Sequence, residues 1–154
     1  MSITVLDLQS ELIVERVLAI QQSSYAIEAA LIGTWNIPPL HDTAESLQKS
    51  GELFYGCWIE GEIAGLIACT YEGDTLDICR MAVHPDYFRR GIASALLSFV
   101  QDTYADAART IVSTGSGNEP AKQLYLRHGF TQIGEQEVEP GVFLAFFEKQ
   151  HTRD

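Results

Sequence analysis

The sequence predicts an α/β fold with a central mixed β-sheet of about seven strands and helices on both faces. The 154 residues are 46% hydrophobic and 20% charged, which suits one globular domain over residues 1–154. The hydrophobic periodicity gives the order strand, helices, three strands, helix, strand, helix and two strands. The strand–helix–strand unit within that order places parallel strands at the centre of the sheet.

The N-terminal third is predicted to be mostly helical. A short strand covers residues 3–6, and apolar residues recur at helical spacing over 11–20. A second helical segment covers residues 26–31 and ends at Gly33. Residues 36–40 contain two prolines, so an extended loop is expected there.

The remaining elements follow from changes in periodicity. Thr43 caps a short helix that runs to residue 48. Three strands, over residues 53–59, 63–71 and 75–83, should form an antiparallel meander. The chain then continues with a helix after Gly91, a strand at 109–114, a helix at 118–128 and a hairpin of 130–138 with 142–148.

Charge, hydropathy and cysteine content argue against several classes of protein. The net charge of −11 disfavours nucleic acid as a partner, because phosphate binding needs a basic surface, and it would suit a cationic ligand. No run of about 18 apolar residues predicts a membrane span, and the acidic start lacks the features of a secretory signal, so a cytoplasmic protein is expected. Cys57, Cys69 and Cys79 lie in strand-like runs without metal-ligand spacing, which predicts buried thiols and no metal.

The most informative stretch is Met81–Leu97, where a strand ends, a tight loop carries two arginines and a glycine opens an amphipathic helix. The free N–H groups of such a first turn, together with the helix dipole, attract anions, and Gly91 and Ala93 keep side chains out of the way. Arg89 and Arg90 add charge that suits phosphate oxygens. The stretch predicts a phosphate or pyrophosphate cradle, with a solvated basic turn as the alternative.

A second pattern covers residues 118–130. Ala121, Leu124 and His128 share one face at helical spacing, and Tyr125 lies next to that face. A tyrosine in that place either packs in the core or takes part in chemistry.

The two stretches together resemble the GNAT superfamily of acetyl-CoA-dependent N-acetyltransferases, and the predicted order of elements is similar to that fold. The family's cradle follows Q/R-x-x-G-x-G/A, and the matching residues are Phe88-Arg-Arg-Gly-Ile-Ala93, in which Phe88 replaces the usual Gln or Arg. The family's A-x-x-L-Y-x-x-x-G-F pattern is met in full by Ala121, Leu124, Tyr125, Gly129 and Phe130. The resemblance covers nearly the whole chain and is sharpest over about residues 75–130.

The resemblance implies an enzyme that transfers the acetyl group of acetyl-CoA, its cosubstrate, to a primary amine by direct attack in a ternary complex. It implies that the pantetheine arm pairs with the backbone of Met81, Ala82 and Val83, with the Val83 N–H as oxyanion donor. It implies that the pyrophosphate is held by Arg89, Arg90, Gly91, Ile92, Ala93 and Ser94. Asn118 would contact the pantetheine or act only as a helix cap, and Tyr125 would protonate the departing sulfur.

The reaction also needs a way to deprotonate the acceptor. A lysine-like amine has a pKa of about 10.4 and is mostly charged at neutral pH, so a base or a water chain must take its proton. Asp77, on the strand that ends at Val83, is the predicted base, because the resemblance to the histone-acetylating branch places a glutamate there. The alternatives are that Asp77 is an exposed strand carboxylate and that Glu28 or a water chain takes the proton.

The resemblance assigns the acceptor site to the segment after the first strand, which here contains Tyr25, Glu28, Trp35 and residues 37–39. Glu28 lies in an otherwise apolar helical stretch, where it would hold an ammonium group, face water or pair with an arginine. The acceptor is expected to be a small polyamine-like or amino-sugar molecule, or a protein amine.

Two other functions share the cradle. A non-catalytic acyl-CoA-binding or regulatory module would keep the cradle and lose turnover. A nucleotide-phosphate binder is disfavoured, because the chain lacks both G-x-G-x-x-G and the Lys-Ser/Thr of a P-loop. The apolar run 142–147 fits either a homodimer interface or the core.

Overall fold

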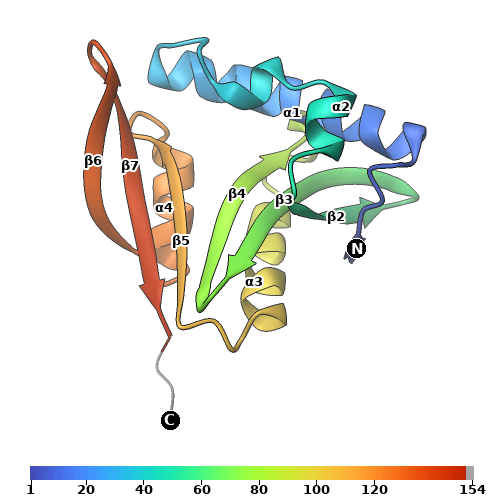
Figure 1. Cartoon of the computed structure of the whole chain (residues 1–154). Coiled ribbons are helices and arrows are strands. Elements are labelled where there is room, and N and C mark those ends of the chain that lie inside the picture. The colour runs from blue at the N-terminus through green and yellow to red at the C-terminus, as the bar shows by residue number, and fades with distance from the viewer. Residues whose placement is uncertain (152–154) are drawn as a thin grey trace.

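A seven-stranded mixed sheet forms the centre of the molecule, with the strand order β1-β2-β3-β4-β5-β7-β6 (Figure 1). The computed structural model describes residues 1–151, so the last three residues of the predicted domain lie outside it. The strands are β1 (Ser2–Val5), β2 (Leu53–Ile59), β3 (Glu62–Glu72), β4 (Thr75–Val83), β5 (Arg109–Gly115), β6 (Thr131–Glu139) and β7 (Val142–Gln150). The α-helices are α1 (Glu11–Ile32), α2 (Ala44–Gln48), α3 (Ile92–Thr103) and α4 (Glu119–Arg127), and short 3-10 helices are η1 (Pro38–His41) and η2 (Pro85–Tyr87).

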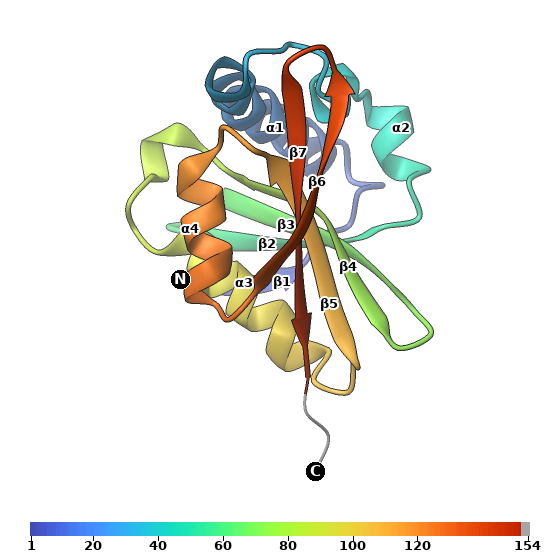
Figure 2. The same cartoon turned by 90° about the vertical axis from the view of Figure 1, so that its left-hand side faces the viewer.

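Helices cover both faces of this sheet, as predicted. Helices α3 and α4 enclose one core, in which Leu96, Leu97 and Phe147 are fully buried. Helices α1 and α2 enclose a second core on the opposite face, with Val17 and Ile20 fully buried (Figures 1 and 2). The amphipathic periodicity read from the sequence therefore faces the sheet in both layers.

The central strands β4 and β5 separate partway along their length and divide the sheet into two arms, one of β1 to β4 and one of β5 to β7. Strands β2, β3 and β4 form the predicted antiparallel meander, and β5 runs parallel to β4. The parallel pairing joins only residues 75–78 of β4 to residues 109–112 of β5, after which the strands diverge (Figure 1). Beyond that point β4 still pairs with β3 up to Val83, and β5 with β7 up to Gly115. Among the described residues, one edge of each arm is thus left without a strand partner.

Two local predictions are corrected. The two predicted helical segments form one helix, α1, because Gln21 and Tyr25, which interrupt the apolar periodicity, are themselves buried against the sheet. Residues 36–40 are not wholly extended: Ile37 is extended, as the following proline requires, but Pro38 begins the 3-10 helix η1. Gly33 ends α1 as predicted, with φ of 85° and its N–H donated to the carbonyl of Ala29.

Cys79 also departs from the expected burial. Cys57 and Cys69 are buried thiols, whereas Cys79 is exposed. The register between β3 and β4 shifts at this point, since Ala68 pairs with Arg80 and Cys69 with Ile78, so Cys79 is the extra residue of a bulge.

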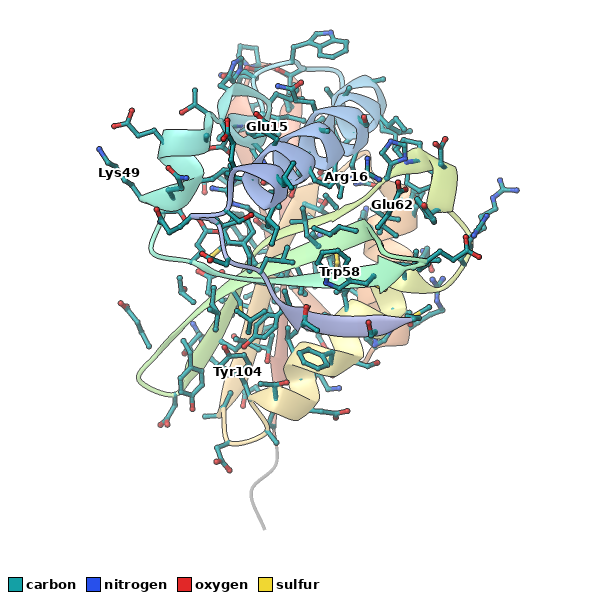
Figure 3. The ribbon with its side chains drawn as sticks, turned by 90° about the vertical axis from the view of Figure 1, so that its right-hand side faces the viewer. Glu15, Arg16, Lys49, Trp58, Glu62 and Tyr104 are labelled. Carbon is teal, nitrogen blue, oxygen red and sulfur yellow. The ribbon has the colours of Figure 1, made fainter. Side chains whose placement is uncertain are left out.

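Long-range hydrogen bonds fix the helices and the first strand to the meander (Figure 3). The Arg16 side chain of α1 donates Nε–H to the carbonyl of Ile63 at 3.0 Å. Trp58 on β2 donates its indole N–H to the Thr4 hydroxyl at 2.9 Å. These contacts hold α1 and β1 to the β2–β3 side of the sheet. The gap in the sheet lies on the other side, where β4 and β5 diverge.

Candidate active site

A cavity of about 1020 Å³ lies where β4 and β5 separate, and α1, α4, the segment before α3 and the start of β7 also contribute to its walls. Eleven of the predicted site side chains line it, namely Tyr25, Glu28, Met81, Val83, Arg89, Gly91, Ile92, Ala93, Ser94, Asn118 and Tyr125, and residues 37–39 of the predicted acceptor segment line it as well. The fold thus brings together residues that are up to 100 positions apart in the chain, from Tyr25 to Tyr125.

The predicted anion cradle forms one end of this cavity. Gly91 is the N-cap of α3 with φ of 75°, and it makes no side-chain cap hydrogen bond. The N–H of Ala95 bonds to the Gly91 carbonyl at 2.9 Å, so the first-turn N–H groups before it lie at the open helix end. A Cβ built at Gly91 would meet nothing within 4 Å, so the positive φ, and not crowding, is what favours glycine here.

The two arginines of the cradle differ in their placement. Arg89 lines the cavity and itself has a left-handed backbone, with φ of 65°. Arg90 is outside the lining, and its guanidinium lies over the ring of Tyr87, 5.3 Å from the centroid. The cradle therefore presents backbone N–H groups and Arg89, and a second cation, Arg127 of α4, also lines the cavity.

The open edge of β4 is partly occupied. Of the three residues predicted to pair with pantetheine, Met81 and Val83 line the cavity, whereas Ala82 is 1% exposed and packs in the α1 core. The Met81 N–H is donated to the Tyr25 hydroxyl of α1 at 3.2 Å. Tyr25 thus binds the same strand edge to which the resemblance assigns the pantetheine arm, which the sequence did not indicate.

Tyr125 lies on α4 and lines the cavity. Its side chain is 4% exposed and packs against the rings of Phe130 and Phe147, with centroid distances of 5.8 and 5.6 Å. Desolvation by burial, with the nearby Tyr25 and Glu28, raises the pKa of the Tyr125 hydroxyl above its ordinary value. The group is therefore a neutral phenol near neutral pH, and its raised pKa makes it a weaker acid than an exposed tyrosine.

A chain of hydrogen bonds connects α4, β5 and α1 across the cavity wall. Asn118 is the N-cap of α4, where its Oδ1 accepts the Ala121 N–H at 3.3 Å, and its amide donates to the Thr114 hydroxyl at 3.3 Å. Thr114 in turn donates to a Glu28 carboxylate oxygen at 2.9 Å, and the Gly115 N–H approaches the same oxygen at 3.5 Å. Glu28 is therefore held by β5 and not by an arginine.

A cluster around Arg80 forms the other end of the cavity, and no local pattern in the sequence indicated it. The guanidinium makes two bonds to Glu52, at 2.9 and 3.1 Å, a short contact with Asp42 and a 3.1 Å bond to Gln21. Burial, the largest influence, tends to raise the pKa of Asp42, but hydrogen bonds from Ser46, Arg80 and Gln21 bring it below its ordinary value. Asp42 is therefore ionised at neutral pH, and Glu52 forms an ion pair with the same guanidinium.

The two ends of the cavity differ in charge. Glu28, Asp42 and Glu52 line one end together with a single cation, Arg80. The other end has Arg89, Arg127 and the positive end of the α3 dipole. Such an arrangement can bind an anionic group at one end and a cationic group at the other.

Besides Ala82 and Arg90, two more residues predicted from the sequence, Asp77 and Trp35, lie outside this lining. Asp77 is on the part of β4 that still pairs with β5, opposite Ile111, and burial followed by the charge of Glu52 raises its pKa. Trp35 is 65% exposed, while its neighbours Thr34 and Asn36 line the cavity. The catalytic role of Asp77 stays a prediction.

Two further features bear on the kind of site. Within residues 1–151, no helix combines the length and the hydropathy that crossing a bilayer requires. In the same described part of the chain, no group of three or more His, Cys, Asp or Glu side chains is arranged to hold a metal ion.

Solved structures with a similar fold include two named N-acetyltransferases. The ribosomal-protein-S18-alanine N-acetyltransferase of Escherichia coli is 18% identical, with a TM-score of 0.78 over 99% of this chain and 95% of that one. The PaiA N-acetyltransferase of Thermoplasma acidophilum, solved in complex with coenzyme A, is 16% identical, with a TM-score of 0.76 over 98% of this chain and 100% of that one. At these identities the likeness concerns the fold.

Sequence relatives are closer but longer. A Bacillus subtilis protein named UPF0157 protein YqkA is 38% identical over 135 residues, which is 88% of this chain and 39% of that protein. An acetyltransferase of Sodalis glossinidius is 38% identical over 68 residues, or 44% of this chain and 47% of that protein. The chain thus matches less than half the length of either relative.

The family assignment rests on a match that covers most of the chain. Residues 15–130 match the profile of the Acetyltransferase (GNAT) family, a range that contains both the cradle before α3 and the Tyr125 helix. The chain therefore belongs to the acetyltransferase (GNAT) family.

Proposed function

We propose that this chain is an N-acetyltransferase that transfers the acetyl group of acetyl-CoA to a primary amine of a small molecule or protein, by direct attack in a ternary complex. The observation that carries the proposal is the single cavity that joins a cationic cradle to a carboxylate-rich end. Tyr125 lines the same cavity and is the proposed proton donor. The diphosphate of acetyl-CoA suits the first end and the ammonium form of an amine suits the second.

The residues of the cradle fit the coenzyme. The first-turn N–H groups of α3 and the Arg89 guanidinium would hold the diphosphate, and the unpaired edge of β4 would accept the pantetheine arm. Acetyl-CoA supplies an activated acetyl group as a thioester. The Val83 N–H would donate to the thioester carbonyl oxygen as it gains charge.

Proton transfer accompanies the attack of the amine. The bound ammonium gives up a first proton, after which the neutral nitrogen bonds to the carbonyl carbon and the carbon–sulfur bond breaks. The nitrogen then loses a second proton to water, while the sulfur takes a proton from Tyr125, which water restores. Glu28 lines the cavity, so we assign the first proton to Glu28, directly or through water. The prediction for Asp77 competes with this assignment, and paired variants of the two carboxylates separate them.

The test is transfer of acetyl from acetyl-CoA to a panel of diamines, polyamines, amino sugars and short peptides with free N-termini. We expect coenzyme A release that depends on the amine, together with an acetylated product 42 Da heavier by mass spectrometry. Binding of acetyl-CoA without transfer to any amine would contradict the proposal and favour the non-catalytic acyl-CoA-binding module. Absence of acetyl-CoA binding would contradict both.

We also propose that the protein acts in the cytoplasm and without nucleic acid, a membrane or a metal as partner. The net charge of −11 supports the proposal on nucleic acid. The free thiols Cys57, Cys69 and Cys79 support a reducing compartment. Strand β7 buries Ala145 and Phe147 in the core and exposes Phe143, so a homodimer stays a prediction that sedimentation would test.

A further inference from the structure

A serine–histidine hydrogen bond joins the cradle to the end of the Tyr125 helix. The Ser94 hydroxyl, in the first turn of α3, lies 2.6 Å from Nε2 of His128, the C-cap of α4. The two residues are 34 positions apart, and the bond links the two helices that lie on the same face of the sheet (Figure 2). Ser94 also lines the cavity at the cradle, whereas His128 does not.

The backbone of His128 is fixed by bonds to its own helix and to β7. Its N–H bonds to the Leu124 carbonyl at 3.1 Å. Its carbonyl accepts from the Lys149 ammonium of β7 at 2.9 Å, and Lys149 also donates to Gln101 of α3 at 3.1 Å. The imidazole ring of His128 can therefore gain or lose a proton while the backbone of the residue stays fixed.

The protonation of His128 sets the direction of the bond. A serine hydroxyl has one proton, so an Nε2 without a proton requires Ser94 to donate to it and to present only lone pairs to the cradle. An Nε2 that carries a proton donates to the Ser94 oxygen and leaves the serine proton free for an anion. Only the imidazolium form makes this second arrangement obligatory, and it adds a positive charge behind the serine.

The surroundings of this histidine disfavour its protonated form. Burial, followed by the charges of Lys149 on β7 and Arg127 on α4, lowers the pKa of His128. The partners that α3 provides, Ser94 and Gln101, are uncharged. An anion bound at the cradle offsets the two cations and makes the protonated form more favourable.

We propose that Ser94 and His128 act as a positioning pair for the diphosphate of coenzyme A, in which protonation of His128 turns the Ser94 hydroxyl toward the phosphate oxygens. The inference rests on the proposed function, because it requires the cradle to hold that diphosphate. It makes coenzyme A affinity dependent on pH through a residue outside the cavity lining. By linkage, a ligand that raises the pKa of His128 must bind more tightly as the pH falls.

The test uses 3′-dephospho-coenzyme A, which lacks the 3′-phosphate that would itself titrate near neutral pH. Calorimetry of the full chain should show affinity that rises about tenfold between pH 8 and pH 6, the order expected for one hydrogen bond to a charged group. The imidazole resonance of His128 should titrate at a higher pH with the ligand than without it. His128→Gln should remove the pH dependence, and Ser94→Ala should weaken binding most at pH 6.

His151→Gln is the matched control. His151 is also hydrogen-bonded to a hydroxyl, that of Thr110 at 2.8 Å, and burial followed by Lys149 lowers its pKa, but it does not line the cavity. This variant should keep the parent's pH dependence. A pH dependence that persists in His128→Gln, or a His128 pKa that does not rise with ligand, would overturn the inference alone. Failure of the parent to bind dephospho-coenzyme A at any pH would overturn the proposed function as well.

Discussion

At the scale of single residues, burial decides what the Tyr125 hydroxyl can do. The ring is enclosed by Phe130 and Phe147, and the loss of solvent raises the pKa of the phenol. A phenol that keeps its proton near neutral pH is a donor and not a base. Since a thiol with a pKa of about 8.5 is already a fair leaving group, a donor at the sulfur contributes only part of the rate enhancement.

Tyr125→Phe is therefore expected to keep the fold and acetyl-CoA affinity, because the ring and its packing remain. The kcat should fall about 10–10³-fold, with a similar fall in kcat/KM, as for an interaction made mainly in the transition state. Steady-state kinetics with a chosen amine measure both quantities. Turnover at the parent rate, with chemistry shown to limit it, would assign Tyr125 to packing alone.

The two candidate bases form a matched pair of carboxylate-to-amide variants. Glu28→Gln should lower kcat by about 10²–10⁴-fold in steady-state kinetics, because Glu28 lines the cavity. Asp77→Asn should leave kcat close to that of the parent, because Asp77 lies on the paired part of β4. If only the Asp77 variant loses kcat, the base prediction for Asp77 is correct and the assignment to Glu28 is wrong.

At the scale of elements, the junction of β4 with α3 carries the cofactor site through its backbone. Gly91→Glu should abolish acetyl-CoA binding, because it places a carboxylate beside the N–H groups and Arg89 that would hold phosphate. Calorimetry with acetyl-CoA measures the loss, and circular dichroism confirms that the variant is folded.

Gly73→Glu controls for backbone strain in this experiment. Gly73 also has a positive φ, of 59°, and a Cβ built there meets nothing within 4 Å, but it does not line the cavity. This variant should bind acetyl-CoA like the parent. Unchanged affinity in a folded Gly91→Glu protein would show that the coenzyme binds elsewhere.

At the scale of the whole molecule, Arg80 connects elements that are distant in the sequence. It joins β4 to Gln21 of α1, to Asp42 after η1 and to Glu52 before β2, and the ion-paired side chains are only 11–12% exposed. Removal of the cation would leave two buried carboxylates without a partner. The cluster therefore ties the wall of the acceptor end to the sheet.

Arg80→Leu should reduce the free energy of unfolding by about 3–5 kcal/mol, the usual cost of breaking a buried pair. Arg109→Leu is the control, since Arg109 pairs with Glu148 at 2.8 Å with its side chain 45% exposed, and should cost about 0–1 kcal/mol. Because the folded pKa of Asp42 is lowered, its contribution is present above about pH 4 and is lost as the pH falls through that pKa. Urea unfolding at pH 7 and pH 3 measures both effects, and equal losses in the two variants would contradict a structural role for the cluster.

The sequence by itself determined the features that depend on near neighbours in the chain. Periodicity of 2 or 3.6 residues shows which side chains share a face, so the order of elements and the meander could be predicted. The Gly91 junction and the Tyr125 motif were equally legible, because a helix start and a helix face are both defined within a few residues. The break predicted within α1 was wrong because Gln21 and Tyr25 are polar residues buried by partners that the local pattern does not contain.

Only the tertiary structure decided which residues meet. The cavity opens where β4 diverges from β5 after residue 78, so Glu28 lines it and Asp77 does not. No local sequence pattern encodes where a parallel pair of strands stops. The Tyr25 bond to Met81 and the Ser94 bond to His128 span 56 and 34 positions. Such contacts follow from strand register and helix packing. Both are set by the many apolar side chains buried in the two cores, and not by the few polar residues that form these bonds.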